Sequence, residues 1–239
     1  MNIQEVISRA ENGDIDAMVD MAEYIVWDEN TKSDVDPELG KKVLEYLDKA
    51  IKAGDDRAMN LLGTMYYSGR VLEKDQAKAM EWYQKAAEKG NSVSMLNLGY
   101  GYYYGNGLEK DMEMAYKMFT KSALLGQQAA IYKVGDMFAN GYFVEKDERA
   151  AFEMYGGSYT IAKEHLDEPE GQEMYSSVCL RLGRCFRDGI GTEKDMLAAE
   201  HFFAEAHYYF KVREERGDYF VEEGLKESKK ALEDILKKG

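Results

Sequence analysis

A three-residue sequence, Glu-Lys-Asp, occurs four times in this chain, and its copies end at Asp75, Asp111, Asp147 and Asp195. The intervals between the copies are 36, 36 and 48 residues. Recurrence at such a period is the signature of a repeat architecture built from small supersecondary units. This feature restricts the fold more than any other, because each unit must bury its apolar face against its neighbours.

Aligned on the aspartate, the copies agree over a whole unit. Numbered from Ala58 as position 1, the first half is apolar at positions 1, 5 and 9 and carries glycine at positions 6 and 12. Such spacing indicates one face of a helix. In the second half, small residues stand 4 and 11 residues after the aspartate, with an aromatic residue between them. The first copy contains Ala58, Leu62, Gly63, Tyr66, Gly69, Asp75, Ala79, Trp82, Tyr83, Ala86, Ala87 and Gly90.

Each recurring residue has a mechanical reason. Glycine at position 6 costs about 1 kcal/mol in a helix interior, so its recurrence predicts the close approach of a neighbouring helix. Glycine at position 12 predicts a left-handed helix end. The aspartate is suited to cap the free amides of a second helix. We therefore predict a helix start within two residues of each of the four aspartates.

This pattern resembles the Sel1-like repeat, a relative of the tetratricopeptide repeat, over about residues 17–212. The tetratricopeptide repeat itself is the alternative, but its period is 34 residues. The resemblance implies an all-α fold, a right-handed α/α solenoid of about five helix-turn-helix repeats with helical caps. Gly105-Asn106-Gly107 and Gly189-Ile190-Gly191 keep the Gly-x-Gly loop of the family. The loops that begin at Gly69 and Gly141 lack the second glycine, so we expect them to differ locally.

The repeat predicts one solenoid over residues 1–239. Its expected parts are an N-terminal cap (1–16), a degenerate repeat (17–54), four repeats (58–90, 94–126, 130–162 and 178–212), an insertion region (163–177) and a C-terminal capping helix (219–239). The insertion adds 12 residues within 156–172, which we expect to lengthen two helices around a turn near Asp167–Pro169. The stretch Asp28–Asp36 predicts a long acidic loop.

Charge restricts the partners. The chain has a net charge of −14, and residues 1–57 hold 15 acidic and 7 basic residues. This charge disfavours nucleic acid and favours a basic protein or peptide, with solubility alone as the alternative explanation. The N-terminus lacks the features of a signal peptide, and no apolar run approaches the roughly 20 residues that span a bilayer. We expect a cytoplasmic protein without a membrane partner, and the sequence leaves its oligomeric state open.

No residue pattern predicts catalysis, a metal site or a cofactor. Cys179 and Cys185 point about 240° apart on a helix, so we predict two core thiols rather than a disulfide. His201 and Glu205 have the i, i+4 spacing of a metal pair, but two such residues are a weak indication. His207 stands at a packing position. Nucleotide-binding and nucleophile motifs are absent from the sequence.

A candidate binding surface follows from helical geometry. The face opposite the core carries positions 3, 7, 10 and 11. The resemblance to tetratricopeptide-like solenoids implies that the first helices line a concave groove. The candidate ligand-binding residues are Tyr67, Tyr100, Tyr103, Tyr104, Tyr132, Arg184 and Arg187. Tyrosine and arginine are enriched at binding hot spots. The alternative is that some of these tyrosines pack between adjacent repeats.

The two arginines predict a carboxylate in the ligand. Together with the acidic chain, they favour a ligand of mixed charge. The resemblance implies a non-catalytic adaptor or scaffold that binds a protein or peptide, and the insertion is a second candidate site. Two alternatives stay open: a hydrolase of the β-lactam or penicillin-binding type described for cysteine-rich relatives, and a structural subunit that self-associates.

Overall fold

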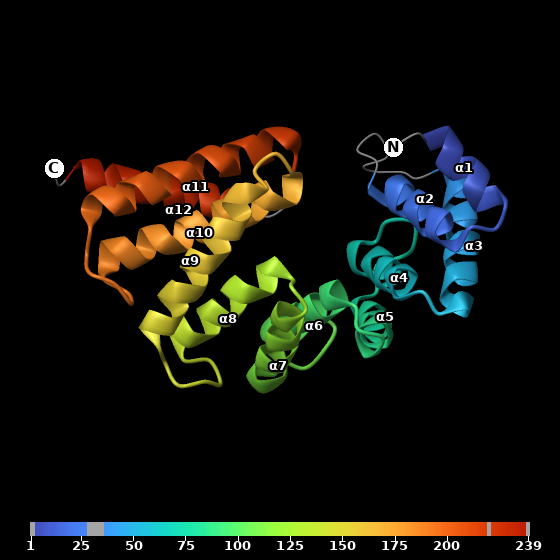
Figure 1. Cartoon of the computed structure of the whole chain (residues 1–239), viewed down its shortest axis with the longest axis horizontal. Helices are drawn as coiled ribbons and strands as arrows, with labels where there is room; N and C mark the ends of the chain where they lie inside the picture. The colour runs from blue at the N-terminus through green and yellow to red at the C-terminus, as the bar shows by residue number, and fades with distance from the viewer. Residues whose placement is uncertain (1–2, 28–35, 219–220, 238–239) are drawn as a thin grey trace. The chain divides into compact units, whose positions relative to one another are not determined.

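The computed structural model describes residues 3–27, 36–218 and 221–237, and within these residues it contains twelve α-helices and no strand (Figure 1). The all-α prediction is therefore confirmed. The helices form two compact units, Met1–Ser122 and Ala123–Gly239, which are described separately below. None of the described helices is long and apolar enough to cross a membrane. The acidic loop predicted at Asp28–Asp36 falls mostly outside the described residues, and Asp36 caps a helix.

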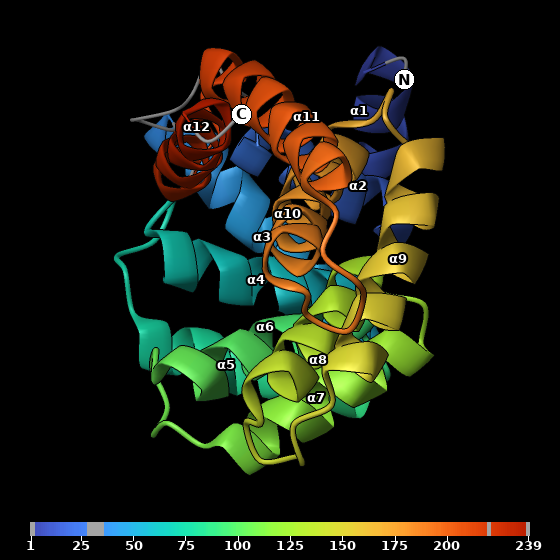
Figure 2. The same ribbon diagram turned by 90° about the vertical axis from the view of Figure 1, so that its left-hand side faces the viewer.

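The first unit is built from helix hairpins. Its helices are α1 (Ile3–Glu11), α2 (Ile15–Trp27), α3 (Pro37–Ala53), α4 (Asp56–Ser68), α5 (Gln76–Glu88), α6 (Ser92–Tyr104) and α7 (Met112–Leu124). From α1 to α6, each helix packs against the next one in this series, and α4 also contacts α2. Figure 2 shows α3, α4 and α5 in succession. This is the stacked hairpin arrangement of an α/α solenoid, as the repeat predicts.

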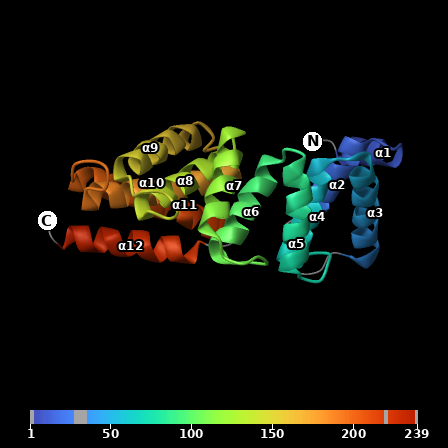
Figure 3. The ribbon, with the colours of Figure 1, turned by 90° about the horizontal axis from the view of Figure 1, so that it is seen from below.

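The second unit has longer helices. They are α8 (Gln128–Asn140), α9 (Glu148–Glu164), α10 (Pro169–Asp188), α11 (Met196–Arg216) and α12 (Glu222–Leu236). The central helix is α10, which contacts all four of the others. The C-terminal helix α12 runs alongside α11 (Figures 1 and 3).

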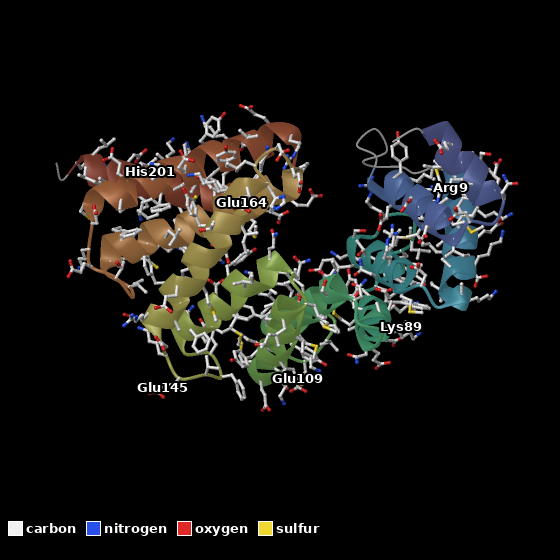
Figure 4. All side chains as sticks on the ribbon, in the orientation of Figure 1. Arg9, Lys89, Glu109, Glu145, Glu164 and His201 are labelled. Carbon is white, nitrogen blue, oxygen red and sulfur yellow. The ribbon has the colours of Figure 1, made fainter. Side chains whose placement is uncertain are left out.

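The four aspartates begin four helices, as predicted. In each copy the carboxylate accepts a hydrogen bond from the backbone N–H three residues later, at 2.9–3.0 Å. The aspartate N–H also bonds back to the carbonyl at position 9, for example from Asp75 to Tyr66 at 2.8 Å. Glu109 and Glu145, which open two of the tripeptides, lie in the loops ahead of α7 and α9 (Figure 4). The aspartate of the tripeptide thus caps the second helix and hydrogen-bonds to the first helix of the same repeat.

The glycine at position 6 is a point of close helix approach, as its recurrence predicts. A Cβ at Gly99 would lie 2.4 Å from the ring of Phe119, and one at Gly183 would lie 2.8 Å from Phe203. The equivalent distances are 2.8 Å from Gly63 to Tyr83 and from Gly135 to Tyr155. The recurring aromatic residue therefore packs directly on the backbone of its partner helix.

Two loops correct an expectation. Val71 and Phe143 stand where the other copies have Gly107 and Gly191, and all four residues have a positive φ of 66–73°. The backbone conformation is therefore kept without the second glycine. Gly107 is tightly enclosed, since a Cβ there would lie 2.3 Å from the carbonyl oxygen of Gln76. Val71 instead packs against the apolar core around α1 to α4.

The insertion lengthens two helices around a turn, as predicted. The helices α9 and α10 have 17 and 20 residues, against 13 in α4, α6 and α8. The turn at residues 165–168 is tight, because a Cβ at Gly171 would lie 1.8 Å from the carbonyl oxygen of His165. The added turns of α10 pack on α11, which has 21 residues. Three side-chain hydrogen bonds join them: Tyr175 to Glu205, Arg213 to Ser176 and Arg216 to Gln172.

Candidate functional site

The predicted surface residues belong to both units. The described structure places Tyr67, Tyr100, Tyr103 and Tyr104 in the first unit and Tyr132, Arg184 and Arg187 in the second. Their role in binding stays a prediction, while their surroundings distinguish them from one another.

Three tyrosines of α6 form one aromatic cluster. The ring of Tyr104 stacks at 6.2 Å from Tyr100 and meets the ring of Tyr103 edge-on at 4.8 Å. Tyr100 and Tyr103 in turn lie 5.5 and 6.3 Å from Phe119, which is fully buried. Tyr104 is 57% exposed. The cluster therefore has a base in the core and an accessible ring at its tip.

Tyr67 of α4 is half-buried. It packs against a small core that contains Tyr83 and Leu98. Its hydroxyl accepts a hydrogen bond of 3.4 Å from the side-chain amide of Asn106, in the loop after α6. Tyr67 thus helps to join α4 to the following hairpin and offers only part of its ring to a ligand.

Tyr132 is buried, with only 6% of its surface exposed. The guanidinium of Arg181 lies 4.6 Å from its ring centroid. Leu96 and Leu180 occupy the same position 3 and are each 7% exposed. Helical geometry within one repeat puts position 3 opposite the core, but stacking places it between successive first helices. This burial leaves Tyr132 little surface for a ligand.

Asp136 of α8 is the centre of a buried polar network. Both of its carboxylate oxygens accept hydrogen bonds of 2.6 Å from Arg181, and Tyr155 donates a third bond of 2.8 Å. Burial acts to raise the pKa of Asp136, but the adjacent charge and hydrogen bonds of Arg181 outweigh it, so the pKa is held below its usual value. Lys133 lies 3.7 Å away, and burial followed by repulsion from Arg181 lowers its pKa to about 8.

Both predicted carboxylate-binding arginines already bind carboxylates of this chain. Arg184 binds Glu227 of α12 through two hydrogen bonds, of which the Nε–Oε1 bond is 2.5 Å. Arg187 binds its neighbour Asp188 through bonds of 2.9 and 2.6 Å. The carboxylate that occupies Arg184 therefore comes from the C-terminal helix.

A pocket of about 290 Å³ opens beside Arg184, between α8, α10, α11 and α12. Its basic lining residues are Lys133, Arg181, Arg184 and Arg213, and its acidic ones are Glu173, Glu223 and Glu227. Sequence reasoning missed this pocket. The sequence does contain a signal for it. Position 4 is basic in two successive repeats, as Lys133 in the third and Arg181 in the fourth, and position 7 of the third repeat is Asp136.

Groups able to perform nucleophilic or metal chemistry are enclosed or separated. Cys179 and Cys185 are free and buried, and burial raises the pKa of both thiols, that of Cys185 to about 12. His201 is exposed on α11 (Figure 4), and Glu205 accepts a hydrogen bond from Tyr175 instead of facing a metal. Within the described residues, no group of three or more His, Cys, Asp or Glu side chains has the arrangement of a metal site.

Comparison with solved structures shows similarity of fold. A Sel1 repeat protein from Oxalobacter formigenes matches with a TM-score of 0.65 and 20% identity, covering 98% of this chain and 96% of the other. A sel1 repeat protein from Klebsiella pneumoniae gives a TM-score of 0.57 at 18% identity, with 98% of each chain covered.

A protective antigen present in uropathogenic Escherichia coli strains, described as displaying an SLR fold, gives a TM-score of 0.59 at 19% identity. The match covers 98% of this chain but only 56% of the antigen, so the present chain spans little more than half of that protein. No protein of curated function matches the sequence significantly.

The family itself is shown by sequence. The Sel1 repeat model matches residues 56–91, 92–127, 128–156 and 176–206, which together cover more than half of the chain. The matches contain the four aspartate caps and the four glycines that contact aromatic rings. With twelve described helices and no described strand, this chain belongs to the Sel1 repeat family.

Proposed function

We propose that this protein is a non-catalytic adaptor that binds a protein or peptide on the first-helix face of its repeats. Sel1-repeat proteins are typically protein-interaction scaffolds, which supports the proposal at the level of the family. The buried thiols with raised pKa values favour binding over nucleophilic catalysis.

The aromatic cluster of α6 is the observation that carries the proposal. Tyr104 presents more than half of its surface, while its neighbours Tyr100 and Tyr103 fix its position through contacts that reach Phe119. A rigid tyrosine supplies a large contact area and loses little conformational entropy on binding. Such residues are typical anchors of protein interfaces.

The test is a titration with the native partner. The protein captures partners from its own cell, and mass spectrometry identifies them. Isothermal titration then compares the wild type with Tyr104→Ala, which removes the exposed ring and leaves Tyr100 and Tyr103 on the core. We expect the dissociation constant to rise by at least about 30-fold, as for the loss of a hot-spot residue worth about 2 kcal/mol.

Tyr24→Ala is the matched control. Tyr24 is 49% exposed on α2 of the same unit, away from positions 3, 7, 10 and 11. Circular dichroism should show unchanged helicity for both variants. Equal affinities of Tyr104→Ala and the wild type would contradict the assignment of this surface.

A further inference from the structure

The contact between Arg184 and Glu227 has the geometry of a bound ligand group. A guanidinium that holds a carboxylate by two parallel hydrogen bonds is the strongest common form of carboxylate recognition. Here the carboxylate belongs to α12, which packs on α10 and α11 through the small buried residues Gly224, Ser228 and Ala231. Glu227 is placed at the edge of this contact, on the wall of the pocket.

The charges around the pocket divide by element. The walls from α8, α10 and α11 supply four basic residues and only one acidic residue, Glu173, whereas α12 supplies two acidic residues, Glu223 and Glu227. Arg181 pairs with Asp136, and Arg213 pairs at 3.2 Å with Asp218, which also binds Arg216 at 2.6 Å. Among the described residues, the carboxylate that reaches Arg184 is that of Glu227. Arg184 is thus the basic residue of these walls whose carboxylate partner comes from α12, whereas Lys133 and Arg181 share Asp136.

The Arg184–Glu227 pair is accessible to a competitor. The two side chains are 40% and 30% exposed, so water and ions reach the pair and it contributes little to stability. The buried Arg181–Asp136 pair differs, because its side chains are only 15% and 17% exposed. A ligand carboxylate can therefore replace Glu227 at Arg184 far more readily than it can replace Asp136 at Arg181.

We propose that the pocket of the second unit receives a carboxylate of an acidic peptide on Arg184, and that Glu227 is a built-in competitor for this position. The proposal rests on the proposed function as a peptide-binding adaptor, and it assigns the chemistry of a ligand group that the second unit binds. Occupation by Glu227 lowers the fraction of binding-competent protein, and the apparent affinity falls by that fraction.

Fluorescence anisotropy with a defined probe tests this. The probe is a fluorescein-labelled peptide, Ser-Gly-Tyr-Glu-Glu, titrated with the full-length protein at low ionic strength. We expect Glu227→Gln to bind the probe about 5- to 10-fold more tightly than the wild type, because it releases Arg184. Arg184→Gln should reduce binding at least 10-fold. Glu222→Gln removes the same charge from an exposed position of α12, and should change the affinity less than about 2-fold.

Two further probes identify the carboxylate. An amidated form of the peptide removes the terminal carboxylate, and a form with glutamine at both glutamates removes the side-chain carboxylates. The carboxylate whose removal cancels the difference between Glu227→Gln and Glu222→Gln is the one that Arg184 holds.

Three results would overturn the proposal. They are equal affinities of Glu227→Gln and Glu222→Gln, wild-type affinity of Arg184→Gln, and no binding of any probe to Glu227→Gln at millimolar concentration. These outcomes are independent of the Tyr104 titration. If the pocket fails while Tyr104→Ala still weakens the native partner, the adaptor proposal stands and only the assignment of a carboxylate to Arg184 is wrong.

Discussion

The residue at position 7 of a repeat contacts the recurring aromatic residue of the second helix in several of the repeats. In the first repeat Thr64 lies 3.2 Å from the hydroxyl of Tyr83, and in the third Asp136 accepts a hydrogen bond from Tyr155. Where the aromatic partner is phenylalanine, as at Phe119, position 7 carries Tyr100 in edge contact instead. In these three repeats the residue at position 7 contacts the aromatic residue of its own repeat, whereas in the fourth repeat position 7 is Arg184, which binds Glu227. Asp136 also binds the next first helix, through Arg181.

Asp136→Asn should destabilise the protein by about 3 kcal/mol. The amide keeps the shape but leaves Arg181 as a buried charge without a carboxylate, which is a costly change. Urea unfolding followed by circular dichroism measures the loss. Glu153→Gln is the control, since its pair with Arg149 is 65% and 84% exposed and should contribute less than about 0.5 kcal/mol. Similar losses of unfolding free energy in both variants would show that the Asp136 network stabilises the protein no more than an exposed ion pair does.

The buried thiols predict a fall in stability at alkaline pH. Burial raises the pKa of Cys185 from 9.0 to about 12, so its stabilising contribution is complete below pH 9 and is lost as the pH rises from about 9 towards 12. Between pH 8.5 and 10 the unfolding free energy of the wild type should fall more steeply than that of Cys185→Ala, by about 1 kcal/mol per pH unit. Lys133 acts in the opposite direction, but it is present in both proteins and cancels in the comparison. Parallel slopes would mean that the Cys185 thiol ionises as freely in the folded chain as in the unfolded one.

Among the helices, the glycines divide into two kinds that substitution can separate. Gly99 of α6 faces the buried Phe119 ring, whereas a Cβ at Gly156 of α9 would meet nothing within 4 Å. Gly99→Ala should therefore destabilise the protein by about 2 kcal/mol through overpacking. Gly156→Ala should stabilise it by up to about 1 kcal/mol, because alanine favours the helix. Thermal unfolding of the two variants checks the opposite signs, and a neutral Gly99→Ala would show that the two helices can separate without cost.

The elements were predictable because their signals are local. The aspartate caps, the glycine ends and the lengthened α9 and α10 all follow from residues within one repeat. The lateral contacts were not predictable in the same way. Whether Tyr132 lies in a groove or under Arg181 depends on which side chain the next first helix presents, which the pattern of a single repeat does not contain. For the same reason the contact between Arg184 and Glu227, which lie 43 residues apart in the sequence, was not foreseen.

On the scale of the whole molecule, the net charge of −14 and the guanidinium of Arg184 act on an acidic ligand at different distances. At about 10 mM salt the Debye length is about 30 Å, so an approaching acidic peptide is repelled by the whole chain. Raising the salt to about 150 mM shortens this range to about 8 Å and should speed association of the acidic probe several-fold. Stopped-flow anisotropy measures the rate, with the glutamine form of the peptide as the control. Slower association at higher salt would indicate that the local basic charge governs the approach.

The insertion also limits how this protein can be rearranged. The repeats at 58–90 and 94–126 have helices of equal length, so one of these repeats could replace the other without changing the length of the helices. The hairpin from α9 to α11 has no such freedom, since its extra turns match only one another, through pairs such as Arg216 with Gln172. A recombination or engineered graft that exchanges α10 alone would leave Arg213, which is only 4% exposed, facing a helix too short to meet it. We therefore expect a graft to be able to exchange a single regular repeat, whereas the segment from Glu148 to Arg216 should keep its packing only when it is transplanted as one piece.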